Sequence, residues 1–247
     1  VNKVEKKEKI RRPIAPFITS TLQQEASRHY RFPVAKTMSI AQGLYEGIDM
    51  KNEGYEGLIT YMRTDSVQVA KEAITSARKF IRNKYGKEFL PEKPNFYKSK
   101  KAAQEAHEAI RPTNLNHPPE KIKKYLSNEQ FKLYSLIWNR FIASQMNPAI
   151  YNTIFADIIT DKKLNLKVTG STIKFLGFLK IYQEKFDDKE EEKENILPKL
   201  EKGIKLTKKE VSAIQSFTKP PPRFTEASLV KELEKCEIGR PSTYASI

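Results

Sequence analysis

The spacing of apolar residues changes at Pro148, and this change constrains the fold more than any other feature of the sequence. Before Pro148, apolar residues recur every three or four positions, which is typical of amphipathic helices. The clearest example starts at Ser127 and carries, on one face, Phe131, Tyr134, Ile137, Trp138, Phe141 and Ile142. After Pro148, the alternation of apolar and polar residues at 164–169 and again from Ile173 predicts antiparallel strands. The sequence therefore predicts an α+β fold.

The order of these patterns also predicts the domains. A short extended stretch at 1–18 precedes a helical block at 19–147, and a strand-rich block follows at 148–218. We expect the helical block to be inserted into a β-rich domain whose first strand lies before it. Residues 219–247 begin a third, mixed domain. Because they stop just after a helix cap, we expect the chain to be a piece of a longer protein.

Local signals predict the individual elements. A capping box at Ser20 or Thr21 starts a helix that ends near Tyr30, and Pro33 opens a second helix. The long helix after Ser127 has a capping box of its own. The other predicted elements are a strand at 58–62, a helix capped by Asp65 or Ser66, a helix at 102–110, a turn at 169–171, a strand at 211–217 and a short helix capped by Thr225.

The charge of the chain narrows the choice of partners. Lys and Arg outnumber Asp and Glu by 45 to 30, a formal net charge of +15. So basic a chain favours polyanions, nucleic acid before an acidic membrane surface. No apolar run approaches the roughly 18 residues of a membrane span, which excludes a transmembrane role. With Cys236 as the only cysteine, an intramolecular disulfide cannot form, and we expect a reducing, cytoplasmic location.

Tyr61 and Arg63 are the first candidates for chemistry. In an extended segment, residues two apart point the same way, so both side chains can face one site. A helix that starts near Ser66 would add free N–H groups, which suit a phosphate. A tyrosine hydroxyl has a pKa of about 10 and needs cationic help to attack phosphorus, which Arg63 can supply. The plainer interpretation is a tyrosine packed in a core beside a solvated arginine.

Two further clusters could bind anions. His107 and Arg111, four apart on a predicted helix, combine a titratable group with a permanent cation, as a phosphate clamp or a proton shuttle requires. Arg240, Ser242 and Thr243 stand at a predicted helix start, although the two hydroxyls can equally serve as caps. The sequence has no closely spaced aspartate triad and no glycine-rich Lys-Ser/Thr loop, so we expect neither a metal site nor an ATP site in it.

Four ordered stretches resemble the bacterial type IA DNA topoisomerases. They are PFITSTLQQEA at 16–26, GLITYMRTDS at 57–66, AHEAIRPT at 106–113, and FTEASLV at 224–230 followed by GRPSTY at 239–244. The resemblance extends from about residue 13 to the end of the chain. It implies an enzyme that cuts one DNA strand, joins a tyrosine to the 5′-phosphate, passes another strand and reseals without ATP, relaxing negative supercoils.

The resemblance also assigns roles by motif position. Tyr61 would be the nucleophile, Arg63 the cation that stabilises the transition state, and His107 a DNA contact that assists proton transfer. The remaining DNA-binding residues would be Arg111, Arg240, Ser242 and Thr243. Residues 19–147 would be the tyrosine-bearing helical domain, 1–18 and 148–218 the arch or hinge domain, and 219–247 the start of a DNA-groove domain.

The family pattern further implies what lies outside the chain. Mg²⁺ would serve the intact enzyme through ligands elsewhere, so the chain alone is predicted not to cleave DNA. Its partners would be single-stranded and negatively supercoiled DNA, and the protein would be monomeric and nucleoid-associated. Other interpretations stay open: a non-catalytic basic module that holds single-stranded nucleic acid, a tyrosine-dependent nuclease or recombinase, or another type IA member such as topoisomerase III or a reverse gyrase.

Overall fold

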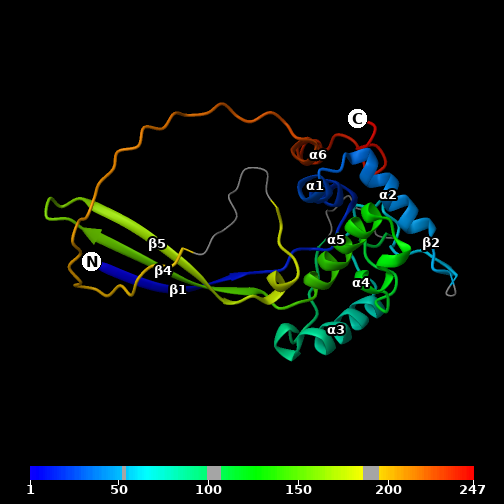
Figure 1. The fold of residues 1–247 in the computed structure, drawn as a ribbon, viewed down its shortest axis with the longest axis horizontal. Coiled ribbons are helices and arrows are strands. Elements are labelled where there is room, and N and C mark those ends of the chain that lie inside the picture. Colours follow the sequence, from blue (N-terminus) through cyan, green and yellow to red (C-terminus); the bar gives the residue numbers. More distant parts are fainter. Residues whose placement is uncertain (52–53, 99–106, 186–194) are drawn as a thin grey trace. The chain divides into compact units, whose positions relative to one another are not determined.

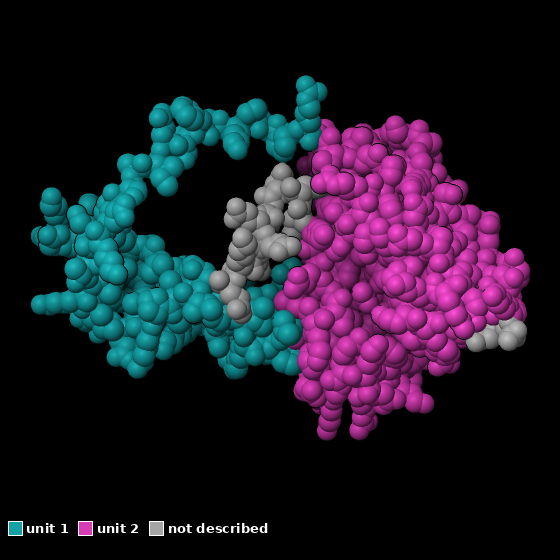
Figure 2. Space-filling model, viewed as in Figure 1, with its two compact units in different colours: residues 1–11, 148–176, 190–223 teal, residues 12–147, 177–189, 224–247 magenta. Residues whose placement is uncertain are grey.

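The computed structural model describes residues 1–51, 54–98, 107–185 and 195–247. Packing divides the chain into two compact units, coloured separately in Figure 2: unit 1 is residues 1–11, 148–176 and 190–223, and unit 2 is residues 12–147, 177–189 and 224–247. The antiparallel three-stranded sheet belongs to unit 1, and the α-helices belong to unit 2. The predicted α+β class is confirmed, whereas the predicted domain limits stay a prediction.

The helices of unit 2 pack around α5 (Asn128–Ser144), which contacts α1 (Thr19–Tyr30), α2 (Val34–Glu46) and α4 (Pro119–Ile122) (Figure 1). Its inward face carries Tyr134 and Phe141, both almost fully buried. The predicted capping box at its start is confirmed, because Ser127 Oγ accepts the Gln130 N–H at 3.2 Å and Gln130 Oε1 accepts the Ser127 N–H at 2.9 Å. Local sequence and tertiary burial therefore agree in this helix.

The first helix begins earlier than expected. α1 starts at Thr19, and the Ile18 N–H donates to Thr21 Oγ1 at 3.0 Å, so the predicted capping boxes at Ser20 and Thr21 are wrong. Its predicted end at Tyr30 and the start of α2 after Pro33 are confirmed. The remaining elements of unit 2 are β2 (Ile48–Asp49), β3 (Tyr55–Glu56), α3 (Lys71–Tyr85), the 3₁₀ turns η2 (Lys87–Phe89), η3 (Lys123–Tyr125) and η4 (Gly177–Lys180), and α6 (Glu226–Lys235).

The C-terminal helix α6 packs on α1. Thr225 caps it as predicted, since its Oγ1 accepts the Ser228 N–H at 3.1 Å. The Glu226 carboxylate also accepts the Val34 N–H at 2.6 Å, which ties the start of α6 to the start of α2. Among the helices of the described ranges, none has the length and apolar content that crossing a membrane requires.

A buried polar cluster joins α1, α5 and the residues after η4. Arg140 is 5% exposed; its Nε donates to the Ala15 carbonyl at 2.5 Å and its Nη1 to Tyr182 Oη at 3.1 Å. The Tyr182 hydroxyl donates in turn to Glu25 at 3.0 Å. The guanidinium also lies 4.9 Å from the Phe17 ring centroid. Burial raises the pKa of Tyr182 above its usual range, so this phenol stays neutral.

Unit 1 contains a three-stranded antiparallel sheet in the order β1-β4-β5. β1 (Lys3–Arg11) pairs with β4 (Ala149–Ile159) from Lys3 opposite Asp157 to Arg11 opposite Ala149. β4 turns at 160–164 into β5 (Asn165–Phe175), and Lys163 adopts a positive φ of 61° in that turn. The period-two patterns at 164–169 and from Ile173 both fall on β5, so they predicted one strand and not the β4–β5 pair. The basic first segment, β1, is an edge strand of the sheet.

Two predictions for this unit are wrong. Residues 169–171 do not turn but lie inside β5, where a Cβ on Gly170 would come within 2.5 Å of Leu197 Cγ. The glycine therefore serves a close approach between chain segments and not a turn. Residues 211–217 form no strand, because this exposed segment pairs with no neighbouring strand in the described ranges. A segment with alternating apolar residues forms a strand only where a neighbouring strand is available to pair with its backbone.

Candidate active site

Tyr61 lies on a loop and not on the predicted strand. Within residues 58–62 the structure has a single bridge, between Ile59 and Pro112, while Leu58, Ile59 and Met62 are about 1% exposed. Tyr61 is 43% exposed, and Arg63 is exposed as well. Exposed and buried residues alternate along this loop. The side chains of Tyr61 and Arg63 are therefore open to solvent, while their neighbours pack into the core.

The predicted helix start near Ser66 is wrong, since α3 begins at Lys71. Hydrogen bonds from side chains hold the intervening backbone in turns: Thr64 Oγ1 accepts the Ser66 N–H at 3.0 Å, and Ser66 Oγ accepts the Gln68 N–H at 3.2 Å. Such bonds compete with the helical pattern, which delays the helix. The helix end adjacent to the Tyr61 loop is that of α1, whose first residue, Thr19, donates its N–H to the Thr64 carbonyl at 2.9 Å.

The Thr19 hydroxyl fixes the loop on the C-terminal side of Tyr61. Its Oγ1 lies 2.7 Å from the Met62 carbonyl and 3.0 Å from the Thr64 carbonyl, and it accepts the Thr64 N–H at 2.9 Å. Thr19 itself is fully buried. Because these bonds form away from water, they hold the backbone on either side of Arg63 in one conformation.

Thr60 fixes the loop on the other side. Its Oγ1 donates to the Ala109 carbonyl at 2.7 Å and accepts the Arg111 N–H at 3.0 Å, and the Thr60 N–H donates to the Arg111 carbonyl at 2.9 Å. The segment that carries His107 is thereby held against the segment that carries Tyr61. The backbone next to the tyrosine is anchored on both sides by threonine hydroxyls.

Two rings flank Tyr61. The His107 ring centroid lies 6.3 Å from that of Tyr61 at an interplanar angle of 70°, and the Tyr45 centroid lies 5.3 Å away at 64°. Both contacts are edge-to-face, a favoured geometry that restricts the orientation of the phenol. Tyr45 was not among the predicted site residues; it is 40% exposed, and its ring lies beside that of Tyr61.

His107 and Arg111 do not share a helix face. Residues 102–106 of the predicted helix lie outside the described residues, and from His107 to Arg111 the backbone is not helical, with bridges from Ile110 to Phe17 and from Pro112 to Ile59. Arg111 Nη2 pairs with Glu108 Oε2 at 2.7 Å, and the other Glu108 oxygen accepts the Ala70 N–H at 2.5 Å. Glu108, which was not among the predicted site residues, therefore links this segment to the start of α3.

Arg240, Ser242 and Thr243 form an exposed turn after α6, not the start of a described helix. Thr243 Oγ1 accepts the Arg240 N–H at 2.8 Å, and Gly239 precedes them at a φ of +80°. The threonine hydroxyl thus caps its own turn. Within the described residues no hydrogen bond joins this turn to the Tyr61 loop, so the structure leaves these two predicted sites separate.

The ionic character of the site comes from Arg63. Across the described ranges it forms no ion pair, which leaves a full positive charge two residues from an exposed phenol. The same ranges contain no group of three or more His, Cys, Asp or Glu side chains that could hold a metal ion. The site can therefore offer a hydroxyl, a guanidinium and an imidazole to a phosphate.

Comparisons with known proteins identify the family to which the chain belongs. The DNA topoisomerase family model of the bacterial type matches residues 1–247. The crystal structure of full-length topoisomerase I from Thermotoga maritima superposes with a TM-score of 0.77 at 39% sequence identity, over 99% of this chain. The matched region is 39% of the length of the Thermotoga chain. The chain belongs to the bacterial type IA DNA topoisomerase family.

Proposed function

We propose that this chain carries the tyrosine with which a type IA topoisomerase opens and reseals one strand of DNA. The observation that carries the proposal is the exposed Tyr61, which Thr19 and Thr60 hold on a fixed backbone beside Arg63, a cation without an ion pair among the described residues. A nucleophile that must meet a phosphorus atom in line needs this combination of access and fixed position.

In the proposed reaction, Tyr61 Oη attacks the phosphorus of a phosphodiester. The phenol loses its proton, an O–P bond forms to the tyrosine, the bond from phosphorus to the 3′-oxygen breaks, and that oxygen leaves with a proton. The 5′-phosphate remains esterified to Tyr61. Since one phosphoester replaces another, the strand can be resealed by the reverse attack without ATP.

Arg63 and His107 are the proposed assistants. The Arg63 guanidinium can bind two non-bridging oxygens at once, which holds the phosphate and stabilises the charge that develops on it. His107, whose ring contacts Tyr61, would contact DNA and assist proton transfer. Arg111 stays a predicted DNA contact, although in the structure its guanidinium is paired with Glu108.

The exposed turn at Arg240, Ser242 and Thr243 is proposed to hold single-stranded DNA. Mg²⁺, which the family implies, does not fit the described residues, because these provide no cluster of three ligands. The chemistry above therefore involves no step through a metal. Negatively supercoiled DNA as substrate, a monomeric protein and a nucleoid location belong to the same proposal.

The test is relaxation of negatively supercoiled plasmid by the intact protein with Mg²⁺, with Tyr61→Phe as the variant. We expect relaxation and the covalent protein–DNA adduct to fall to background, while single-strand binding and the unfolding curve stay unchanged. Tyr55→Phe is the matched control, since it removes the hydroxyl of another exposed tyrosine, and it should relax normally. Full activity of Tyr61→Phe would contradict the proposal.

A second function, a basic module that only holds nucleic acid, is favoured by the net charge of +15. It predicts that Tyr61→Phe has no effect on any activity of the intact protein. A nuclease would yield nicked or linear plasmid, whereas resealing yields closed, relaxed circles. The 247-residue chain alone is expected to form no denaturation-resistant adduct with a single-stranded oligonucleotide, and such an adduct would show that the chain is sufficient for cleavage.

A further inference from the structure

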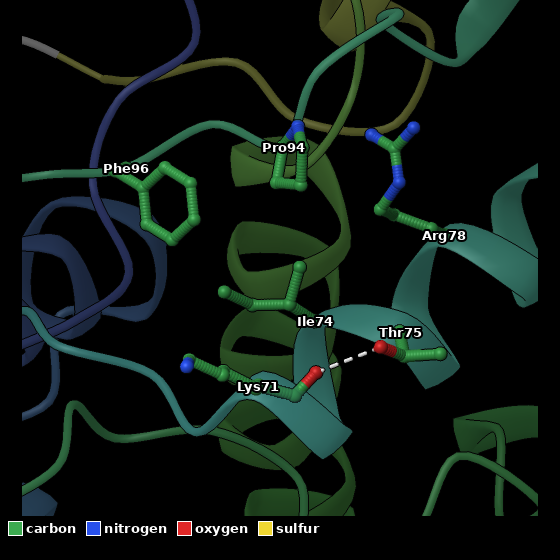
Figure 3. Close-up of a pocket in the computed structure, with 6 residues that line it drawn as sticks. All are labelled: Lys71, Ile74, Thr75, Arg78, Pro94 and Phe96. Carbon is green, nitrogen blue, oxygen red and sulfur yellow. Dashed lines mark hydrogen bonds between the residues drawn. The ribbon is translucent and has the colours of Figure 1, made fainter.

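A groove lies between α3 and the segment that follows η2 (Figure 3). Its volume is about 340 Å³, and its lining residues are Lys71, Ile74, Thr75, Arg78, Pro94 and Phe96. None of them belongs to the Tyr61 loop, to the segment at 107–113 or to the turn after α6. The groove therefore lies outside the residues that the proposed cleavage reaction uses.

The apolar part of the groove includes an unusually exposed aromatic ring. Phe96 is 75% exposed, whereas Ile74 beneath it is 5% exposed. Figure 3 shows Phe96 and Pro94 on one side of Ile74, and Lys71 with Thr75 on the other. A phenyl ring open to solvent, with a proline nearby in the same short segment, presents a flat face at low conformational cost.

The charged side chains that line the groove, Lys71 and Arg78, are both positive. Arg78 Nη2 donates to the carbonyls of Pro91 at 2.9 Å and Glu92 at 3.1 Å, which fixes the guanidinium against the loop. Its Nη1 is buried and has no acceptor among the described residues. In the same part of the chain, neither Arg78 nor Lys71 has a carboxylate partner. α3 as a whole carries five Lys or Arg residues and one Glu.

We propose that this groove is an accessory subsite for single-stranded DNA, in which a base stacks on Phe96 and the adjacent phosphates are attracted by Lys71 and Arg78. Exposed aromatic rings interleaved with cations bind single strands of any sequence, because every base has a flat face. Bases in a duplex are already stacked on each other, so the ring selects single strands. The proposal rests on DNA being the partner, but not on Tyr61 being the nucleophile.

The experiment places a reporter in the groove of the intact protein. Phe96→Trp is made in a Tyr61→Phe background so that no cleavage occurs, and oligo-dT is added while the tryptophan emission is compared with that of the protein without the Trp substitution. The tryptophan of this chain, Trp138, is 3% exposed and gives a constant background. Phe217→Trp is the matched control, since Phe217 is 78% exposed and lies two residues from Lys219 but outside the groove.

We expect saturable quenching at position 96 and little at position 217. Adding Lys71→Gln should reduce the slope of log affinity against log salt by about 0.7, the value for one lost phosphate contact. Phe96→Ala should weaken binding of single-stranded DNA at the groove about tenfold, because it removes the ring on which a base stacks. Crosslinking of an oligonucleotide that contains 5-iododeoxyuridine to peptides of α3 measures this change. Both variants leave the Tyr61 loop intact.

Several results would overturn the proposal. One is a labelled oligonucleotide that binds, by anisotropy, without quenching at position 96. Others are equal quenching at positions 96 and 217, or equal quenching by polyglutamate, which would assign the groove to acidic polypeptides. None of these bears on Tyr61, whose own test is adduct formation, so the two proposals fail separately.

Discussion

The Tyr61 loop of unit 2 and the sheet of unit 1 hold their backbones in opposite ways. The loop has almost no regular structure, yet its backbone is held by hydrogen bonds to the buried Thr19 hydroxyl and from the Thr60 hydroxyl to the Ala109 carbonyl, each between residues more than 40 positions apart. The sheet pairs along its whole length with one register shift, at Ile150 and Tyr151, yet Ile10, Phe155, Leu164 and Leu166 remain largely exposed on its strands and turn. Regular hydrogen bonding and burial are thus separate sources of order, and the candidate site depends on burial.

The largest expected effect on stability is at Arg140, in the buried cluster of unit 2. Arg140→Met leaves the Ala15 carbonyl and Tyr182 hydroxyl without their donor, and we expect it to destabilise the fold by about 3 kcal/mol. Arg63→Met removes an exposed guanidinium and should cost less than about 0.5 kcal/mol. Urea unfolding of both variants measures the difference, and equal midpoints would contradict the role assigned to burial.

The next effect is at Thr19. Thr19→Val keeps the shape of the side chain but leaves the buried Thr64 N–H without its hydroxyl acceptor, at an expected cost of about 2 kcal/mol. Thr113→Val is the control, because this hydroxyl donates to the Gly57 carbonyl at an exposed position where water can replace it, at about 0.5 kcal/mol. A similar loss of stability in both would mean that the loop is not held by buried bonds.

Substitution of Gly170 tests whether β5 packs closely against Leu197. Gly170→Ala would place a methyl group against Leu197 and the Asn195 carbonyl, and should destabilise unit 1 by about 1–2 kcal/mol. Gly43→Ala has space, with Gln130 Nε2 3.8 Å away, and should stabilise α2 by up to about 1 kcal/mol. Thermal unfolding curves that move in the same direction for both variants would refute the close approach.

The smallest effects concern acid stability. Burial raises the pKa of Glu25, but hydrogen bonds from His29, Tyr182 and Arg28 together hold it below its usual value. This stabilisation is present above the pKa of the unfolded state and is lost as pH falls through the lower folded value. Glu25→Gln should therefore flatten the decline of stability below about pH 5.

Glu5 is the control for this prediction. Hydrogen bonds from Lys3 and Lys7 lower the pKa of Glu5 to about 2, but this exposed group is screened by salt.

Accordingly, Glu5→Gln should leave the acid branch of the unfolding curve unchanged in high salt, and Glu25→Gln should change it at any salt concentration. Urea midpoints between about pH 3 and pH 7 at two salt concentrations provide the measurement. If the change caused by Glu25→Gln depended on the salt concentration, the Glu25 carboxylate would be exposed to solvent, which would contradict its burial in the structure.

The sequence predicted the elements whose signals are local. α5 and α6 begin where Ser127 and Thr225 offer capping hydroxyls, and the apolar spacing that follows is helical. The Tyr61 loop could not be predicted in the same way, because its hydrogen bonds come from Thr19 and from the backbone near Ala109, which no local pattern connects to it. The roles of Tyr61 and Arg63 stay predictions from the motif. No local pattern could show that the ring of Tyr45 lies beside that of Tyr61.

The most direct test of the central claim is to identify the residue that becomes linked to DNA. The intact protein would be trapped with a cleaved oligonucleotide, digested with nuclease and protease, and sequenced by mass spectrometry. We expect a nucleotide esterified through its 5′-phosphate to Tyr61 in the wild-type protein, and no adduct in the Tyr61→Phe variant. A nucleotide attached to Tyr45, whose ring lies 5.3 Å from that of Tyr61, or to any other residue would contradict it.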